Sequence, residues 1–252
     1  MNKGVIFDLD GTIYYGNTIV KGAIETISEL QKFGYEIIFF TNNSTKKRSE
    51  IFKKLISLGI NTELNRVYTS SFATGVYLKS NAIDKVFLIG TKEFKEELSD
   101  FGIHIVEETK AQAVIVGLDV NFDYEKLSKS LIAVNNGAKI IVCNKDKNFP
   151  IENGVKKPGC NAMVSALLGS CDSGIDVDYI IGKPNTYLLE IICKDWNLDK
   201  KLIYVVGDSL ESDIAMADNY GVKSILVGSS VNYGLEEVIT IIKGEDDECI
   251  RI

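Results

Sequence analysis

Short apolar runs alternate with amphipathic stretches along almost the whole of this 252-residue chain. This alternation is typical of βαβ units, in which helices cover both faces of a parallel sheet. The pattern predicts strands over residues 4–7, 35–40, 67–69, 178–182, 202–207 and 223–228. It predicts helices over about 22–33, 45–58, 71–80, 185–195, 211–219 and 234–243. Gly34, Gly59 and Gly221 stand where three of these helices should end.

The middle of the chain contains an α/β set of its own. It begins with KVFLIG (85–90) and continues through a helix, two further apolar runs, a second helix and the run AKIIVCN (138–144). A stretch with this much regular pattern is a domain and not a loop. We therefore predict a doubly wound, Rossmann-like α/β core formed by residues 1–81 and 179–252, with an inserted α/β cap domain over residues 82–178.

Four predicted strands of the core run into residues that suit phosphate or metal. In chain order these residues are Asp8-Leu9-Asp10-Gly11-Thr12, Thr41-Asn42-Asn43-Ser44, Lys183-Pro184, and Asp208 with Asp213. In open parallel sheets, ligands bind in the crevice beyond the carboxyl ends of the strands. We therefore expect the four groups to converge on one site.

The carboxylates of this set suit a divalent cation. Asp8 and Asp10 are two residues apart on an extended chain, so their side chains leave it on the same side. Two carboxylates held that close cannot both stay ionised without a cation. Asp208 would complete a set of hard oxygen ligands suited to Mg²⁺. A metal-neutralised carboxylate can attack phosphorus, and a second carboxylate can protonate the leaving oxygen and later activate water.

The other groups suit the phosphate itself. We predict that Thr41 and the amides of Asn42 and Asn43 open a helix, where free N–H groups and the helix dipole bind anions. Lys183 offers a point charge to the phosphoryl oxygens, which carry the charge in the transition state. Pro184 suits the first position of the next helix and would fix Lys183 at its base.

These groups resemble the four motifs of the haloacid dehalogenase superfamily of phosphohydrolases. DLDGT (8–12) resembles the first motif, Thr41 with the run after it the second, Lys183 in GKP the third, and GDSLESD (207–213) the fourth. Each motif alone has an ordinary structural interpretation as a turn or a helix cap. All four in order, each after an apolar strand, are highly specific.

The insertion between the second and third motifs is similar to the NagD-like, 4-nitrophenylphosphatase and phosphoglycolate phosphatase branch, and this resemblance covers nearly the whole chain. It implies that Asp8 is the nucleophile and Asp10 the general acid/base. It implies Mg²⁺ bound by Asp8, the backbone carbonyl of Asp10 and Asp208, with Asp213 supporting these ligands.

The cap sequence bears on substrate choice. PGCNA (158–162) resembles the cap loop of the branch, although Cys160 and Asn161 differ from its usual small residues. A redox-sensitive Cys160 over the active site is one hypothesis, and an ordinary small residue is the favoured one. Asn144 and Asp146 follow the last apolar run of the insert, and either a substrate contact or a turn role is open to them.

Composition excludes several classes of protein. The net charge of −7, with acidic and basic residues interleaved, lacks the basic footprint of nucleic-acid binding. The first apolar run is too short for a signal peptide or a spanning helix, so we expect a cytoplasmic protein with no membrane partner. Five scattered cysteines without C-x-x-C spacing argue against a disulfide framework or a zinc site. A single histidine, His104, argues against a histidine phosphatase, and no P-loop motif is present.

We therefore expect a Mg²⁺-dependent phosphatase that hydrolyses a small-molecule phosphate monoester through an aspartyl-phosphate intermediate. The substrate types expected are sugar phosphate, phosphoglycolate, glycerol phosphate and 4-nitrophenyl phosphate. Three alternatives stay open, namely a nucleoside monophosphate 5′-nucleotidase, a phosphotransferase or mutase, and a non-catalytic binding module. A homodimer is also possible.

Overall fold

A computed structural model describes residues 1–150, 155–228 and 233–249. Its internal contacts divide the chain into two compact units. Unit 1 comprises Met1–Thr41, Phe52–Val67 and Leu189–Ile252, and unit 2 comprises Asn42–Ile51 and Tyr68–Leu188.

Unit 1 is organised around a five-stranded sheet in the order β14-β13-β1-β4-β5. The strands are β1 (Asn2–Asp8), β4 (Glu36–Thr41), β5 (Val67–Thr69), β13 (Leu198–Gly207) and β14 (Lys223–Leu226). The pairs β14–β13, β13–β1 and β1–β4 are parallel. Because β1 is the middle strand, both of its faces are covered, which is why its run GVIFD is continuously buried and does not alternate with polar residues.

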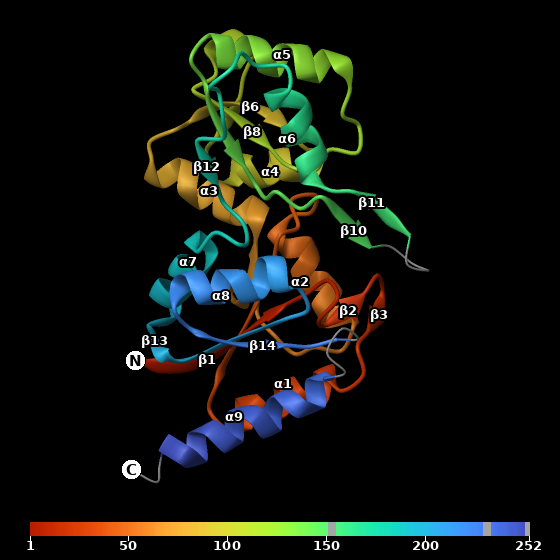
Figure 1. Ribbon diagram of the computed structural model, residues 1–252, viewed down its shortest axis with the longest axis vertical. Coiled ribbons are helices and arrows are strands. Elements are labelled where there is room, and N and C mark those ends of the chain that lie inside the picture. The colour runs from red at the N-terminus through yellow and green to blue at the C-terminus, as the bar shows by residue number, and fades with distance from the viewer. Residues whose placement is uncertain (151–154, 229–232, 250–252) are drawn as a thin grey trace. The chain divides into compact units, whose positions relative to one another are not determined.

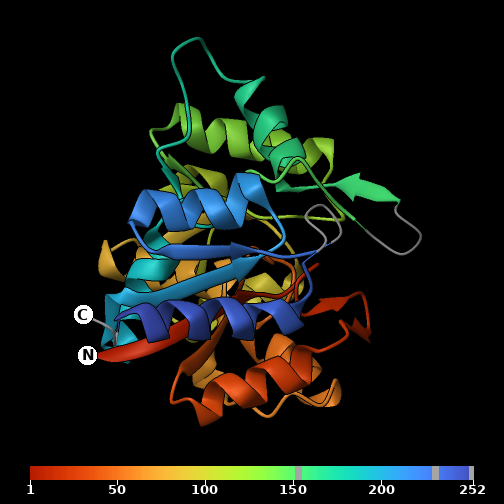
Figure 2. The ribbon, with the colours of Figure 1, turned by 60° about the horizontal axis from the view of Figure 1, so that its bottom comes forward.

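Helices cover both faces of this sheet. They are α1 (Ala23–Lys32), α2 (Arg48–Ser57), α7 (Tyr187–Trp196), α8 (Ala215–Tyr220) and α9 (Leu235–Cys249). In both views α8 lies on one side of β13 and β14 and α9 on the other (Figure 1 and Figure 2). The Thr26 hydroxyl donates to the Leu235 carbonyl at 3.0 Å, and Lys243 pairs with Glu29 at 2.8 Å, so α9 is fastened along α1.

Short elements complete unit 1. They are the hairpin β2 (Tyr14–Tyr15) and β3 (Thr18–Ile19), the 3₁₀ turn Leu64–Arg66, and the π turn Leu210–Ile214 directly before α8. The π turn and α8 together take the place of the single helix predicted at 211–219.

Unit 2 has a second five-stranded sheet, in the order β12-β9-β8-β6-β7, with every pair parallel. The strands are β6 (Lys85–Ile89), β7 (His104–Ile105), β8 (Ala113–Val116), β9 (Lys139–Val142) and β12 (Tyr179–Ile180). The other elements are α3 (Ser70–Ser80), α4 (Lys92–Asp100), α5 (Tyr124–Asn135), α6 (Cys160–Leu168), the 3₁₀ turn Glu108–Lys110, and the hairpin β10 (Asn148–Pro150) and β11 (Lys156–Pro158).

The core of unit 2 follows from strand alternation. Val114 and Val116 point to one face of β8 and pack with Cys160 and Val164 of α6 in one buried cluster. Ile115 points to the opposite face and is also fully buried. The apolar run QAVIVG therefore has both faces covered, as a central parallel strand requires.

The predicted doubly wound α/β architecture is confirmed, and the strand predicted at 67–69 agrees with β5 at both ends. One strand assignment is wrong. The run at 178–182 is predicted to belong to the core sheet, whereas the strand within it, β12, pairs with β9 in the sheet of unit 2. The predicted domains (1–81 with 179–252, and 82–178) stay a prediction. Within the described part of the chain, no helix combines the length and the apolar character that crossing a membrane needs.

Candidate functional site

Two neighbouring strands of unit 1 end in carboxylates. Asp8 is the last residue of β1, and Asp208 directly follows β13. The two strands are parallel, with Phe7 opposite Val206, so their carboxyl ends lie at the same edge of the sheet. The sequence prediction for Asp8 and Asp208 rested on this arrangement, and the structure brings the two residues together.

A third carboxylate joins them. Oxygen atoms of Asp8, Asp208 and Asp213 all lie within 4.8 Å of one another. Asp8 is 4% exposed and Asp213 only 1% exposed. Buried carboxylates this close repel one another strongly unless a cation neutralises them. The cluster therefore has the hard oxygen donors and the negative charge that fit Mg²⁺.

Two glycines make room for the cluster. A side chain at Gly11 would collide with the Asp208 carboxylate, and Gly11 also has a φ of 102°. A side chain at Gly207 would collide with the Asp213 carboxylate. The glycines of DLDGT and GDSLESD are thus required by the close approach of backbone to carboxylate.

The π turn holds Asp213 in place. The Ser209 N–H donates to Asp213 Oδ2 at 3.1 Å, and the Ser212 N–H donates to the Ser209 hydroxyl at 3.3 Å. The sequence predicted that Asp213 supports the metal ligands without binding the ion itself. Its oxygen belongs to the cluster itself, and the division of labour among the three carboxylates stays a prediction.

Asp10 lies on a turn that follows β1. The Gly11 N–H donates to the Tyr14 carbonyl at 2.9 Å, and Asp10 and Tyr14 form an isolated bridge. The Thr41 hydroxyl, at the end of β4, donates to Asp10 Oδ2 at 3.4 Å. Asp10 is exposed, which suits a group that must exchange protons with substrate and water.

Sequence reasoning missed two residues beside Asp10. Burial raises the pKa of Tyr14, and the negative charges of Asp10 and Asp8 raise it further. The Lys54 ammonium lies 3.4 Å from the centre of the Tyr14 ring, and burial lowers the pKa of Lys54 although Asp10 opposes this effect. Nothing in the spacing of Tyr14 and Lys54 could have shown their proximity, because they come from separate elements.

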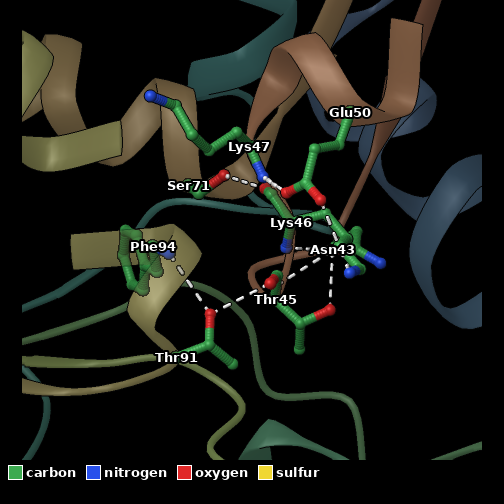
Figure 3. Close-up of polar contacts among 8 residues, drawn as sticks. All are labelled: Asn43, Thr45, Lys46, Lys47, Glu50, Ser71, Thr91 and Phe94. Atoms are coloured by element: carbon green, nitrogen blue, oxygen red, sulfur yellow. Dashed lines mark hydrogen bonds and ion pairs between the residues drawn. The ribbon is translucent and has the colours of Figure 1, made fainter. Parts of the chain in front are cut away.

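The prediction that Thr41, Asn42 and Asn43 open a helix is wrong, whereas their role in phosphate binding stays a prediction. Thr41 ends β4 and does not open a helix, because α2 begins only at Arg48. The intervening loop of unit 2 is held by polar contacts (Figure 3). Asn43 Oδ1 accepts from the N–H groups of Thr45 and Lys46 at 2.9 and 3.1 Å, and the Thr91 hydroxyl donates to the Thr45 carbonyl at 2.9 Å. The Asn43 side chain therefore shapes the loop.

Lys183 lies in unit 2, on the turn that follows β12, and it is 3% exposed. The expectation for Pro184 is wrong. The sequence predicts it at the first position of the next helix, whereas α7 begins at Tyr187 and the Lys183–Pro184 peptide is cis. The Lys183 N–H is instead bound by Asn42 Oδ1 at 2.8 Å.

The cap residues divide into two groups. Asn144 and Asp146 lie in the segment that follows β9, where Asn144 Oδ1 accepts from the Asp146 N–H at 3.1 Å, so a turn role is present. Cys160 is the first residue of α6 and not part of a loop, and it is 2% exposed. Burial raises the pKa of its thiol well above the ordinary value, which favours the ordinary small residue over the redox-sensitive alternative. The four cysteines whose side chains are described are free thiols.

Comparison with known proteins agrees with these motifs. A model of haloacid dehalogenase-like hydrolases matches residues 5–104, and a second model, of HAD-hydrolase-like proteins, matches residues 180–239. The chain is 34% identical to the sugar-phosphatase AraL of Bacillus subtilis, over 89% of this chain and 82% of that protein. It is 32% identical to phosphoglycolate phosphatase 2 of Arabidopsis thaliana, over 90% of this chain and 82% of that protein.

Solved structures agree with the fold. A p-nitrophenyl phosphatase from Archaeoglobus fulgidus matches with a TM-score of 0.85 at 30% identity, covering 96% of this chain and 92% of that chain. A 4-nitrophenylphosphatase from Thermotoga maritima matches with a TM-score of 0.84 at 30% identity, covering 90% of this chain and 86% of that chain.

Proposed function

Because the chain belongs to the haloacid dehalogenase-like hydrolases, in their NagD-like branch, we propose that it is a Mg²⁺-dependent phosphoric monoester hydrolase of small molecules. The observation that carries the proposal is the cluster of Asp8, Asp208 and Asp213 at the strand ends of unit 1. The names of the relatives support the reaction class, since they are sugar phosphatases, phosphoglycolate phosphatases and nitrophenyl phosphatases.

Asp8, the backbone carbonyl of Asp10 and Asp208 would hold the Mg²⁺ ion, with Asp213 supporting them. The closeness of three carboxylates and the burial of Asp8 and Asp213 support this assignment. When bound, the ion neutralises the carboxylates and offsets the negative charge of the phosphoryl oxygens.

Asp8 and Asp10 carry the covalent steps of the proposal. A carboxylate oxygen of Asp8 attacks phosphorus, the bond from phosphorus to the ester oxygen breaks, and protonated Asp10 gives its proton to that oxygen. Asp10 then takes a proton from water as the water oxygen attacks phosphorus. The bond from phosphorus to Asp8 breaks, which releases inorganic phosphate and restores both side chains to their starting states.

Thr41, Asn42, Asn43 and Lys183 serve the phosphoryl group in this proposal. The Thr41 hydroxyl and the amide N–H groups of the loop after it bind phosphoryl oxygens, and Lys183 balances their charge. The order of the four motifs along the chain supports these roles. The 3.4 Å contact of Thr41 with Asp10 supports a second role for Thr41 in this proposal, the orientation of the general acid/base.

We propose that the substrate is of the sugar phosphate, phosphoglycolate, glycerol phosphate or 4-nitrophenyl phosphate type, and the names of the relatives support the first, second and fourth of these. A panel of about a hundred phosphate monoesters, with release of inorganic phosphate as the readout, tests this. Sugar phosphates and phosphoglycolate should lead the ranking, and Asp8→Asn protein should release no phosphate from any of them. A ranking led by nucleoside monophosphates would identify a nucleotidase instead. Transfer of phosphate to an added sugar at the expense of release would identify a phosphotransferase.

A further inference from the structure

One asparagine of the second motif connects four segments of unit 2. The Asn42 amide nitrogen donates to both carboxylate oxygens of Asp146 at 3.1 Å and to the Lys183 carbonyl at 3.2 Å. Its oxygen accepts from the Lys183 N–H at 2.8 Å. The Asn42 carbonyl accepts from the Ser70 hydroxyl at 2.7 Å and from the Asn144 amide at 2.8 Å.

These contacts occupy the donors of the Asn42 side chain. A carboxamide has two N–H bonds. The contacts with Asp146 and with the Lys183 carbonyl use both of them. Phosphate oxygens of a dianionic ester can only accept, so the Asn42 side chain has no N–H left to donate to them. Its predicted role in phosphate binding is therefore restricted to the backbone, and the side chain has another task.

That task is centred on the backbone of Lys183. Asn42 binds the N–H and the carbonyl of this one residue, which fixes the position and the rotation of its peptide groups. Just before it, the Gly182 N–H donates to the Cys143 carbonyl at 2.8 Å. A side chain at Gly182 would collide with Asn42 Oδ1 and with the Cys143 carbonyl, so this turn has no room to shift toward β9.

We propose that Asn42 is a positioning residue, whose carboxamide holds the backbone of Lys183 and couples it to Asp146 in the segment after β9. The proposal rests on the proposed function, in which Lys183 balances the charge of the phosphoryl group. Fixing the backbone at Lys183 restricts where its ammonium can reach, and rate then depends on Asn42 through Lys183.

The first experiment measures the restraint without activity. Metal-free and phosphate-free protein is treated with acetic anhydride, and acetylation of Lys183 is followed by mass spectrometry. Asn42→Ala should raise the rate of Lys183 acetylation by about tenfold or more, because the turn is less restrained once these hydrogen bonds are lost. The matched control is Asn136→Ala, which removes an asparagine bound only to its own helix at Ile132 and should leave the rate at Lys183 unchanged. Equal rates in Asn42→Ala and in the unmodified protein would overturn the proposal.

The second experiment asks whether Asn42 acts through Lys183. Turnover of 4-nitrophenyl phosphate is measured for Asn42→Ala, Lys183→Ala and the double variant, each with its melting temperature. In the unmodified protein, Asn42→Ala should lower kcat/KM by roughly tenfold to a hundredfold. In protein that already carries Lys183→Ala, adding Asn42→Ala should hardly change kcat/KM. A purely structural Asn42 would cost the same factor in both backgrounds, and that result would overturn the proposal.

A third variant covers the case in which Asn42→Ala does not fold. Asn42→Asp keeps the volume and the oxygen that binds the Lys183 N–H, but it sets a carboxylate against Asp146. Adding Asp146→Asn reverses donor and acceptor in the hydrogen bond between residues 42 and 146. It should therefore recover part of the kcat/KM lost in Asn42→Asp. Failure of the added change to recover any rate would contradict the coupling. If Lys183→Ala turns over as fast as the unmodified protein, the role of Lys183 in the proposed function fails, while acetylation still decides whether Asn42 holds Lys183.

Discussion

The two units use polar groups in different ways. In unit 1 the described polar cluster is ionic, because carboxylates of Asp8, Asp208 and Asp213 crowd together at two strand ends. In unit 2 the residues around Lys183 are joined mainly by amide and hydroxyl hydrogen bonds, centred on Asn42. Among the described residues, the cluster of Asp8, Asp208 and Asp213 is the one group of three potential metal ligands.

The two groups of residues therefore depend on different interactions. A crowded ionic cluster is unfavourable until a cation arrives, so its energy depends on an ion. A network of amide hydrogen bonds is satisfied by the protein itself and needs no ion. Unit 1 should therefore respond to metal, and changes in the Asn42 network should alter rate without altering metal binding.

The largest effect is expected from the nucleophile. Asp8→Asn should lower turnover of 4-nitrophenyl phosphate by more than about a thousandfold, because an amide cannot attack phosphorus in place of a carboxylate. Circular dichroism should be unchanged, and Asp195→Asn, an exposed change on α7, should keep full activity. An Asp8→Asn enzyme with more than a few per cent of the activity would falsify the aspartyl-phosphate mechanism.

Metal binding gives the next largest effect. Excess chelator should abolish turnover and Mg²⁺ should restore it. At a hundred times its dissociation constant, an ion bound only by the folded state stabilises it by about 2.7 kcal/mol, which raises the melting temperature by several degrees. Asp208→Asn should remove most of this rise, whereas Asn42→Ala should keep it. A rise of equal size in Asp208→Asn would show that the ion binds elsewhere.

Two glycine-to-alanine substitutions, compared with each other, test the close packing around the carboxylate cluster. Gly11→Ala drives a methyl group into the Asp208 carboxylate and should lower kcat/KM by roughly tenfold to a hundredfold, with weaker Mg²⁺ binding. The matched control is Gly137→Ala in unit 2, where φ is 89° but no atom lies within 4 Å of the added methyl group. Both variants suffer backbone strain, so activity lost in both to the same degree would mean that strain, and not crowding of Asp208, is responsible.

The fold followed from the sequence where the chain is locally regular. Buried parallel strands such as β1 are continuous apolar runs, and Gly34 and Gly221 mark helix ends through their positive φ. The prediction for residues 178–182 is wrong because the apolar pattern of a strand does not show which sheet the strand joins. The similarity of PGCNA to a cap loop hides the start of α6, which begins at Cys160 within this stretch.

The candidate site was predictable to a similar extent. Asp8 and Asp208 follow strands directly, so parallel topology alone brings them together. The membership of Asp213 in the cluster depends on the π turn, and the placement of Lys54 over Tyr14 depends on tertiary packing. The Asn42 network was hidden for a related reason, since its partners are up to 141 residues away in the chain.

The smallest effect is expected at Cys160, where the comparison of the two units predicts a change in stability and not in rate. Its thiol is buried with Val116, Val164 and Leu167 in the core of unit 2, so we expect it to make no contact with a substrate. Cys160→Ala should cost about 1 kcal/mol of unfolding free energy and leave kcat/KM for every ester within about twofold. Burial also raises the pKa of this thiol, so little thiolate exists at pH 8 and iodoacetamide should react there slowly, while the less buried Cys171 reacts first. Peptide mapping after timed alkylation checks the order, and a changed ranking of esters in Cys160→Ala would return this residue to the substrate site.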